Sequence, residues 1–237
     1  MFQPSVSISQ RAPAYVGESA APQEKTFADA PERSPQVLIK GIQRRWRRKQ
    51  RRRKVGRAYD MALEIAPLIP VNSRVLDVGC GNGFIAQHLT ATRGANILGI
   101  DLYAATEAAI DYRQFDGKHF PVADGSVDAA LLCYVLHHAQ DLGAVMNELR
   151  RVLSQNGMVV IYEDIPDAWW DRLVCWTHNL KWRRRTGACT FRSEAEWRAL
   201  FSEAGFEIVT ERPLSRWRNL SHPVCRRLYV LANGERQ

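Results

Sequence analysis

The chain has 237 residues, of which 46% are hydrophobic, and a formal net charge of +8 at pH 7. It is long enough for one α/β domain with an appendage, and it holds no apolar run of about 18 residues that would predict a membrane span. Its five scattered cysteines include no C-x-x-C pair, and its first residues lack the basic start and apolar stretch of a secretory signal. These features favour a cytoplasmic protein with reduced thiols and no bound metal.

The first part of the chain differs in composition from the rest. Residues 1–36 contain five prolines among Ser, Ala and Gln and show no sustained periodicity, which predicts a disordered tail. We expect a basic segment at residues 37–57 and a folded domain at residues 58–237.

Positive charge is concentrated in the basic segment. Residues 40–57 carry eleven Lys or Arg and no acid, and subtracting these from +8 leaves −3 for the remainder of the chain. A short apolar stripe at helical spacing accompanies them, formed by Leu38, Ile42 and Trp46. Such a segment can bind an anionic membrane surface, which would hold the protein peripherally at a membrane, or it can bind RNA. A solvated helix without a partner is the third reading.

From Ser73 onward, strand and helix signals alternate. The expected strands are residues 75–78, 95–103, 127–136, 158–164, 206–211 and 226–232, and helices are expected from about residue 83, over 142–154 and after residue 193. Asp141 is placed to cap the second helix, Ser193 and Glu196 match a capping box for the third, and Gly205 can end it. This alternation predicts a parallel sheet covered on both faces, with ligands at the carboxyl ends of its strands.

Residues 75–83, "VLDVGCGNG", lead from a strand into a glycine-rich loop. The glycine spacing is G-x-G-x-G, because Phe84 stands where the dinucleotide-binding pattern needs its third glycine. Asp77 would repel a pyrophosphate, whereas an acid suits the zwitterionic, cationic end of S-adenosylmethionine. The residues therefore favour S-adenosylmethionine and leave an NAD-dependent oxidoreductase as an alternative.

Four motifs in order resemble those of class I S-adenosylmethionine-dependent methyltransferases. "VLDVGCGNG" resembles their first motif, "LGIDLY" the second and "FDGKHFPVADGSVDAALLCYVLHHAQD" the third and fourth, followed by "ELRRVLSQNGMVVIYED". The likeness runs from about Arg57 to the C-terminus and points to the broad type-11 group that includes ubiquinone and menaquinone biosynthesis enzymes. It implies a Rossmann-like, doubly wound α/β fold with a mostly parallel seven-stranded sheet and an antiparallel last strand. Only fourteen residues separate Asp101 from Asp116, so the helix and third strand between them must be short.

The resemblance also implies a cofactor site. Its predicted residues are Asp77, Gly79, Cys80, Gly81, Gly83, Asp101, Leu102, Asp116, Gly117 and Cys133. The glycine loop would lie under the methionine part, where a side chain at Gly79 or Gly81 would block close approach. Asp101 would accept the ribose hydroxyls, and Asp116 would accept from the adenine amine. Each of these two acids has an alternative reading as a turn residue.

The acceptor side is predicted from two features. His137 and His138 follow the strand at 127–136, at the end where ligands bind, and are the predicted catalytic residues if the nucleophile must lose a proton. Their alternative role is to stabilise the loop. Residues 164–190 are expected to form a helical lid, with tryptophans at Trp169, Trp170, Trp176 and Trp182. Whether the lid contacts substrate or packs on the sheet, an aromatic wall favours an apolar or aromatic acceptor.

Two functional readings follow from these features. In the first, the protein methylates a hydrophobic small molecule or lipid-like metabolite, with the basic segment as a tether. In the second, it is an RNA-associated methyltransferase or a cofactor-sensing nucleic-acid-binding protein. The strand at 127–136 ends in "CYVLHH" in place of the N/D-P-P-Y/F tetrad that marks methylation of planar amino nitrogens in the wider superfamily. An oxygen or carbon acceptor is therefore expected.

Overall fold

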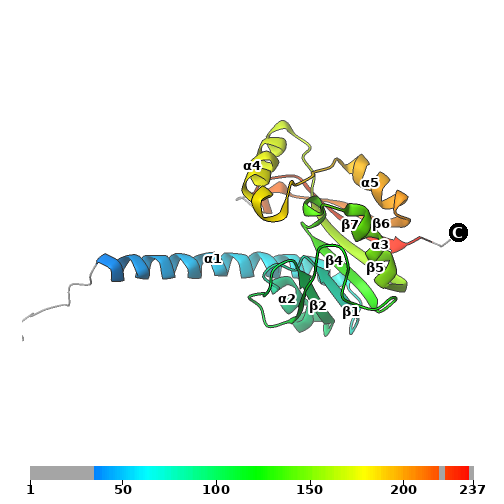
Figure 1. The fold of residues 1–237 in the computed structure, drawn as a ribbon, viewed down its shortest axis with the longest axis horizontal. Helices are drawn as coiled ribbons and strands as arrows, with labels where there is room; N and C mark the ends of the chain where they lie inside the picture. The colour runs from blue at the N-terminus through cyan, green and yellow to red at the C-terminus, as the bar shows by residue number, and fades with distance from the viewer. Residues whose placement is uncertain (1–34, 219–221, 235–237) are drawn as a thin grey trace, which may run out of the picture. The chain divides into compact units, whose positions relative to one another are not determined.

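A computed structural model describes residues 35–218 and 222–234 (Figure 1). The chain forms two units, one ending at Trp46 and one beginning at Arg47. The first helix, α1 (Pro35–Ile65), contains the whole basic segment and the last two residues of the predicted tail. The remainder of that tail lies outside the described residues. Within the described ranges, no helix is both apolar enough and long enough to cross a bilayer.

Seven strands form one sheet. They are β1 (Arg74–Val78), β2 (Asn96–Asp101), β3 (Asp111–Gln114), β4 (Val127–Cys133), β5 (Leu153–Asp164), β6 (Phe206–Leu214) and β7 (Arg226–Asn233). Their order is β3-β2-β1-β4-β5-β7-β6, and β7 runs antiparallel to both of its neighbours while the other pairs are parallel. The predicted mostly parallel seven-stranded sheet with an antiparallel last strand is confirmed.

Helices cover both faces of this sheet. They are α1, α2 (Phe84–Arg93), α3 (Leu142–Val152), α4 (Trp169–Thr186) and α5 (Glu194–Glu203), with short 3-10 turns at Ala66–Leu68, Leu136–His138 and Arg216–Arg218. One buried core joins β-strand side chains to Leu149 of α3 and Trp197 of α5. The other joins the opposite side chains to Ile65 of α1 and Leu89 of α2. Alternating strand residues feed the two cores, as a doubly wound fold requires.

The predicted helix caps form. The Asp141 carboxylate accepts a hydrogen bond from the Ala144 N–H at 2.9 Å, and Ser193 and Glu196 cap α5 reciprocally. Gly205 follows α5 with φ +75°, a backbone conformation that glycine adopts without steric cost. These local signals set where the helices begin and end.

Several element boundaries and one connection differ from the sequence expectation. The strand expected over 127–136 ends at Cys133, because Tyr134 has φ +61° and the next residues form the 3-10 turn. The "QNG" turn at 155–157 lies inside β5, where a shift in the β4–β5 register absorbs the extra residues. Between β2 and β3 the described chain makes bends instead of a helix, and β3 has only four residues. The short connection thus leaves a short edge strand.

Candidate functional site

The glycine-rich loop joins the end of β1 to α2. Gly79 has φ +67°, and a Cβ there would lie 2.6 Å from Cγ2 of Val135. Gly83, with φ +74°, would place a Cβ 2.7 Å from the Thr106 hydroxyl oxygen. Gly81 has φ +55° but faces open space. Packing therefore explains the first and third glycines, and the second leaves room beside the loop for another molecule.

Asp101 at the end of β2 holds this loop in place. Its Oδ2 accepts from the Gly81 N–H at 2.8 Å, and its Oδ1 accepts from the Leu102 N–H at 2.7 Å. Oδ1 also accepts from the Tyr103 N–H at 3.4 Å, whereas Oδ2 can still accept a second hydrogen bond. Asp101 thus orders the loop and keeps acceptor capacity on Oδ2.

Asp77 is buried in β1 with only 2% of its surface exposed. Its Oδ2 has no hydrogen-bond partner within the described part of the chain. Burial, and then the charge of Asp101, raise the pKa of the Asp77 carboxyl to about 8. An unpartnered buried carboxyl next to the glycine loop fits a site that receives a cationic amino-acid end, because a nearby cation stabilises the ionised form.

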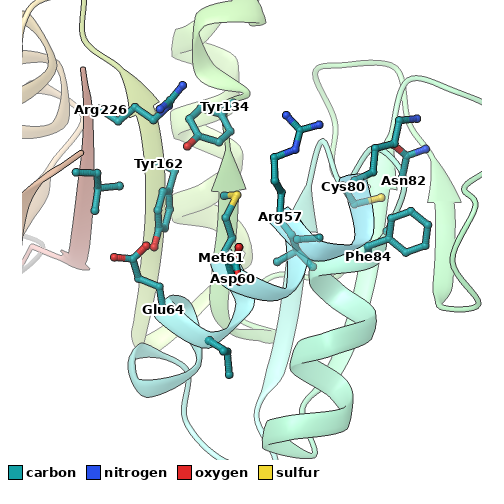
Figure 2. Close-up of a pocket in the computed structure, with 16 residues that line it drawn as sticks. Arg57, Asp60, Met61, Glu64, Cys80, Asn82, Phe84, Tyr134, Tyr162 and Arg226 are labelled. Atoms are coloured by element: carbon teal, nitrogen blue, oxygen red, sulfur yellow. The ribbon is translucent and has the colours of Figure 1, made fainter. Parts of the chain in front are cut away.

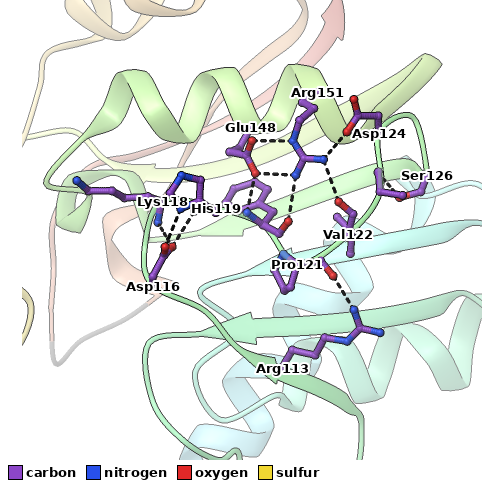
Figure 3. A network of polar contacts seen from close by, with 12 residues as sticks. Arg113, Asp116, Lys118, His119, Pro121, Val122, Asp124, Ser126, Glu148 and Arg151 are labelled. Carbon is purple, nitrogen blue, oxygen red and sulfur yellow. Dashed lines mark hydrogen bonds and ion pairs between the residues drawn. The ribbon is translucent and has the colours of Figure 1, made fainter.

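Asp116 heads the loop between β3 and β4 and is exposed. Its Oδ1 accepts from the Lys118 and His119 N–H groups, and its Oδ2 lies 2.7 Å from Nδ1 of His119 (Figure 3). The His119 and Lys118 hydrogen bonds hold the pKa of Asp116 well below its usual range. Gly117 follows with φ +85°. Asp116 therefore acts as a turn residue in this structure. The other end of the same loop is bound to α3 by Arg151.

That tie is a compact polar network. The Arg151 guanidinium donates to both oxygens of Glu148 at 2.7 Å, to Asp124 at 2.6 Å and to the carbonyls of Phe120 and Val122 (Figure 3). Bidentate pairing of this kind fixes geometry as well as adding energy. The loop carrying Asp116 and Gly117 is thus fixed beside the carboxyl ends of the strands.

Two cavities lie at the carboxyl ends of the strands. The larger, of about 1040 Å³, brings together seven of the predicted site residues: Gly79, Asp101, Leu102, Asp116, Gly117, His137 and His138. The smaller, of about 810 Å³, is lined by Cys80 and Gly83 (Figure 2). Asp77, Gly81 and Cys133 line neither cavity. The larger cavity thus connects the predicted cofactor side to the two histidines.

The smaller cavity lies between α1 and the sheet. Figure 2 shows Arg57, Met61 and Glu64 of α1 facing the rings of Tyr134 and Tyr162. These α1 residues belong to the same unit as the sheet. The sequence did not predict this cavity.

His137 is buried with 1% of its surface exposed. Its Nδ1 lies 2.7 Å from Oε2 of Glu163, whose other oxygen accepts from the Leu136 N–H at 2.7 Å. Burial alone would lower the pKa of His137, but the charge and hydrogen bond of Glu163 outweigh it, so the pKa is raised. Its Nε2 is buried without a hydrogen-bond partner in the described residues. A carboxylate thus orients this ring and leaves one nitrogen available.

Around His138 lies a cluster of histidines from distant parts of the chain. Nε2 of His138 is 3.4 Å from Nε2 of His178 on α4, and the ring of His222 lies 5.1 Å from that of His178. Burial, followed by the charge of His137, lowers the pKa of His138 to about 3 and that of His178 to about 4. His222 in turn hydrogen-bonds Asp164, which also pairs with Arg226.

Sequence reasoning missed most of these partners. Glu163 and Asp164 end β5 next to β4, so the acid pair "ED" at a strand's carboxyl end was a usable signal. His178 and His222 offered none, because their approach depends on how α4 and the segment before β7 pack. The predicted lid helix exists as α4, but Trp169, Trp170 and Trp176 are exposed and only Trp182 of the four lines the larger cavity.

Comparison with known proteins gives a family. Residues 46–211 match the family described as a methyltransferase domain. Malonyl-(acyl-carrier protein) O-methyltransferase of Legionella pneumophila is 32% identical over 126 residues, which cover 48% of this chain and 43% of that enzyme. Ubiquinone biosynthesis O-methyltransferase of Pseudomonas aeruginosa is 28% identical over 173 residues, which cover 64% and 74%. The structure of the (4+2)-cyclase SpnF matches with a TM-score of 0.61 at 17% identity, covering 74% of this chain and 81% of that one.

The chain belongs to the methyltransferase domain family, since the match covers well over half of it. Within that family, it is a class I domain of the type-11 group, whose members use S-adenosylmethionine as the methyl donor. The matched part spans 43%, 27% and 34% of the length of three curated relatives, under half of each. A cyclase shares the fold, so the fold does not by itself define the reaction. The activity, substrate and partners of the whole protein are therefore matters for proposal.

Proposed function

We propose that this protein transfers a methyl group from S-adenosylmethionine to an oxygen or carbon atom of a hydrophobic, lipid-like or quinone-like small molecule. The observation that carries the proposal is the larger cavity, which reaches from Gly79 and Asp101 to His137 and His138. One cavity that joins a cofactor side to a histidine side is what direct methyl transfer requires, because the two reactants must meet in line.

The residues of the cofactor side fit S-adenosylmethionine. Gly79 lines the larger cavity where the methionine part would lie, and the unpartnered Asp77 carboxyl, buried behind the glycine loop, favours its ammonium through negative charge. Asp101 retains acceptor capacity for the ribose hydroxyls, and Leu102 is 44% exposed at the cavity, where an adenine face can pack. When bound there, the cofactor supplies a methyl group already activated by a sulfonium.

Cys80, Cys133 and Asp116 fit this site less directly. Cys80 lines the smaller cavity, and the half-buried Cys133 packs against the core formed with α1 and α2. We propose that both shape the floor of the cofactor site without contacting the ligand. Asp116 and Gly117 line the larger cavity, so we retain them as the adenine edge.

Binding of S-adenosylmethionine tests the cofactor part of this proposal. Calorimetry on the full chain should show saturable binding of S-adenosylmethionine or its demethylated product, and no comparable binding of NAD. A screen of cell extract with labelled cofactor, read by product mass, should then return a hydrophobic product heavier by one methyl group. If neither nucleoside binds to protein that circular dichroism shows to be folded, the proposed function is wrong.

His137 and His138 are the residues we propose to act on the acceptor. Both line the larger cavity at the end of β4, beside Trp182 and Val174 of α4. Replacing His138 with Ala should reduce turnover by about 10²-fold or more, the usual range for a group that assists proton transfer, and leave cofactor affinity intact. Unchanged turnover in His138→Ala would remove this residue from the mechanism.

The basic segment of α1 supports a second proposal, that the protein attaches to an anionic membrane surface. All eleven Lys and Arg side chains of residues 40–57 are exposed, as are Ile39, Ile42 and Trp46. Leu38, the first residue of the predicted stripe, has a side chain outside those described. Cations beside exposed apolar side chains suit a lipid interface, at about 1 kcal/mol for each basic residue near the surface.

Two binding experiments, one with lipid vesicles and one with RNA, distinguish the two candidate partners. Full-length protein should bind vesicles containing phosphatidylserine but not neutral vesicles, and Trp46→Ser should weaken this binding. Binding to RNA with a steep salt dependence, unchanged by Trp46→Ser, would instead favour an RNA-associated methyltransferase. Failure to bind either would leave the segment as a solvated helix.

A further inference from the structure

We propose that His137, His138 and His178 form a binding site for a divalent transition metal of the zinc class, with an open coordination position that faces the larger cavity. The three residues come from the turn after β4 and from α4, and one ring nitrogen of each lies within 4.8 Å of the others. All three line the larger cavity. The sequence predicted no metal, because that expectation considered cysteine spacing and could not foresee the approach of α4.

The hydrogen bonds leave the right nitrogens available. Nδ1 of His137 faces the Glu163 carboxylate, which can only accept, so this nitrogen carries the proton and Nε2 carries the lone pair. That Nε2 is buried and has no partner among the described residues. A carboxylate behind a metal-binding histidine is the usual arrangement for fixing its tautomer and orientation.

His138 is also protonated on Nδ1. Its Nδ1 lies 3.3 Å from the Cys189 sulfur and 3.0 Å from the Thr186 hydroxyl, which itself donates to the Trp182 carbonyl and so accepts from the ring. The lone pair of His138 is then on Nε2, which faces Nε2 of His178 at 3.4 Å. This distance is long for a hydrogen bond. It equals the separation of about 3.3–3.4 Å that two nitrogens have when each lies 2.0–2.1 Å from one tetrahedral zinc ion.

The site is open on one side. Three histidines with a free fourth position are the ligand set of a catalytic zinc site, and imidazole also suits Co²⁺ and Ni²⁺. Pairs of nitrogens as far apart as 4.8 Å must approach to about 3.4 Å on binding, which a rotation of the half-buried His178 can provide. If the proposed methyl transfer is correct, on which this step rests, the fourth ligand is an oxygen of the acceptor, and with the ion bound His137 and His138 act on that oxygen through the ion and not as free bases. The ion would then favour a hydroxyl, phenol or carboxylate over a carbon acceptor.

Metal titration of the full-length protein tests the site without cofactor or acceptor. Protein stripped with a chelator is titrated with Co²⁺ while its visible absorption is recorded, and Zn²⁺ affinity is measured by competition with a chromophoric chelator. We expect one ion per chain and the intense visible bands of four- or five-coordinate Co²⁺. His178→Ala should weaken binding about 100-fold or more, and Glu163→Gln should weaken it about 10- to 100-fold.

Control variants distinguish a specific metal site from non-specific metal binding. His88→Gln alters a histidine on α2 outside the cluster and should leave the affinity unchanged. His178→Gln keeps the size of the side chain and serves if the alanine variant loses its native circular dichroism. Weak, non-saturating binding, or equal affinity in wild type and the folded His178 variant, would overturn the metal site. Binding of S-adenosylmethionine measured on the same metal-free protein reports on the proposed function independently.

Discussion

The cofactor side and the acceptor side of the larger cavity are built in different ways. The cofactor side comes from short sequence motifs: Gly79 in the glycine-rich loop, Asp101 and Leu102 at the end of the neighbouring strand, and Asp116 and Gly117 after β3. The acceptor side brings together His137, His178 and His222, which are far apart in the chain. A motif read along the chain can define the first side. Only packing defines the second.

The largest expected loss of cofactor affinity comes from a substitution at Gly79. In Gly79→Ala the new Cβ would lie 2.6 Å from Val135 at φ +67°, so the loop must move. We expect S-adenosylmethionine affinity to fall about 100-fold or more, in line with overpacking and left-handed backbone costs of about 1–3 kcal/mol each. Calorimetry measures this. Gly125→Ala has a similar φ of +61° but faces open space, and should bind the cofactor like wild type. Equal affinity in both variants would contradict a close approach at residue 79.

A smaller loss is expected at Asp101, which links the two strand ends. In Asp101→Asn one oxygen becomes an NH₂ group that faces the Gly81 or Leu102 N–H, and the charge is lost. Loss of hydrogen bonds to a charged acceptor, at about 1.5–3 kcal/mol, predicts an affinity about 10- to 100-fold weaker for S-adenosylmethionine. The matched change Asp111→Asn, at the exposed start of β3, should have no effect. If the two variants bind equally, Asp101 is a turn residue only.

Asp77 should give a pH-dependent change in stability. Because the pKa of its carboxyl is raised to about 8, the folded protein binds more protons than the unfolded chain between about pH 4 and pH 8, and stability falls as pH rises through this window. Asp77→Asn removes this loss, so its stability relative to wild type should rise by up to about 4 kcal/mol between pH 5 and pH 8, at about 1.4 kcal/mol for each pH unit. Urea denaturation at both pH values measures the difference.

Asp128 provides a control with the opposite sign. Hydrogen bonding to Arg74 lowers the pKa of Asp128 to about 2, so its contribution is present above about pH 4 and is lost only as pH falls toward 2. Asp128→Asn should therefore lose stability equally at pH 5 and pH 8. If Asp77→Asn shows the same flat behaviour, the buried carboxyl of Asp77 is ionised throughout and has a partner.

The sequence predicted local features well and tertiary ones poorly, for physical reasons. The Asp141 and Ser193 caps depend on hydrogen bonds within four residues, so the local sequence is enough to predict them. Tyr134 ends β4 early because its backbone adopts φ +61°. An apolar run of sequence contains no signal for this conformation. The tryptophans of α4 were expected on the cavity wall, yet three of them face away, because a helix of mixed composition shows no clear apolar stripe. The role of His178 appears only in the folded structure, where α4 brings its ring 3.4 Å from His138.

The smallest expected effect concerns Glu107, which connects the basic helix to the glycine loop. Its carboxylate lies 3.7 Å from Arg51 and 3.4 Å from Lys54 of α1, and accepts from the Asn82 amide. These charges are largely exposed, so Glu107→Gln should cost no more than about 0.5–1 kcal/mol at low salt. The difference from wild type in urea denaturation should vanish in 0.5 M NaCl, where the Debye length is only about 4 Å. Glu207→Gln, an exposed change on β6, serves as the control.

A larger stability loss in Glu107→Gln that persists at high salt would show that α1 is held by more than ion pairs. It would mean that contacts other than ion pairs hold residues 51–57 on the domain, such as the Arg51 guanidinium 5.4 Å from the centre of the Phe84 ring. The part of the basic segment that lines the smaller cavity, Lys54 and Arg57, would then be held there independently of ion pairing. Because Lys54 and Arg57 also line the larger cavity, an anionic partner bound to α1 would then act directly on the site.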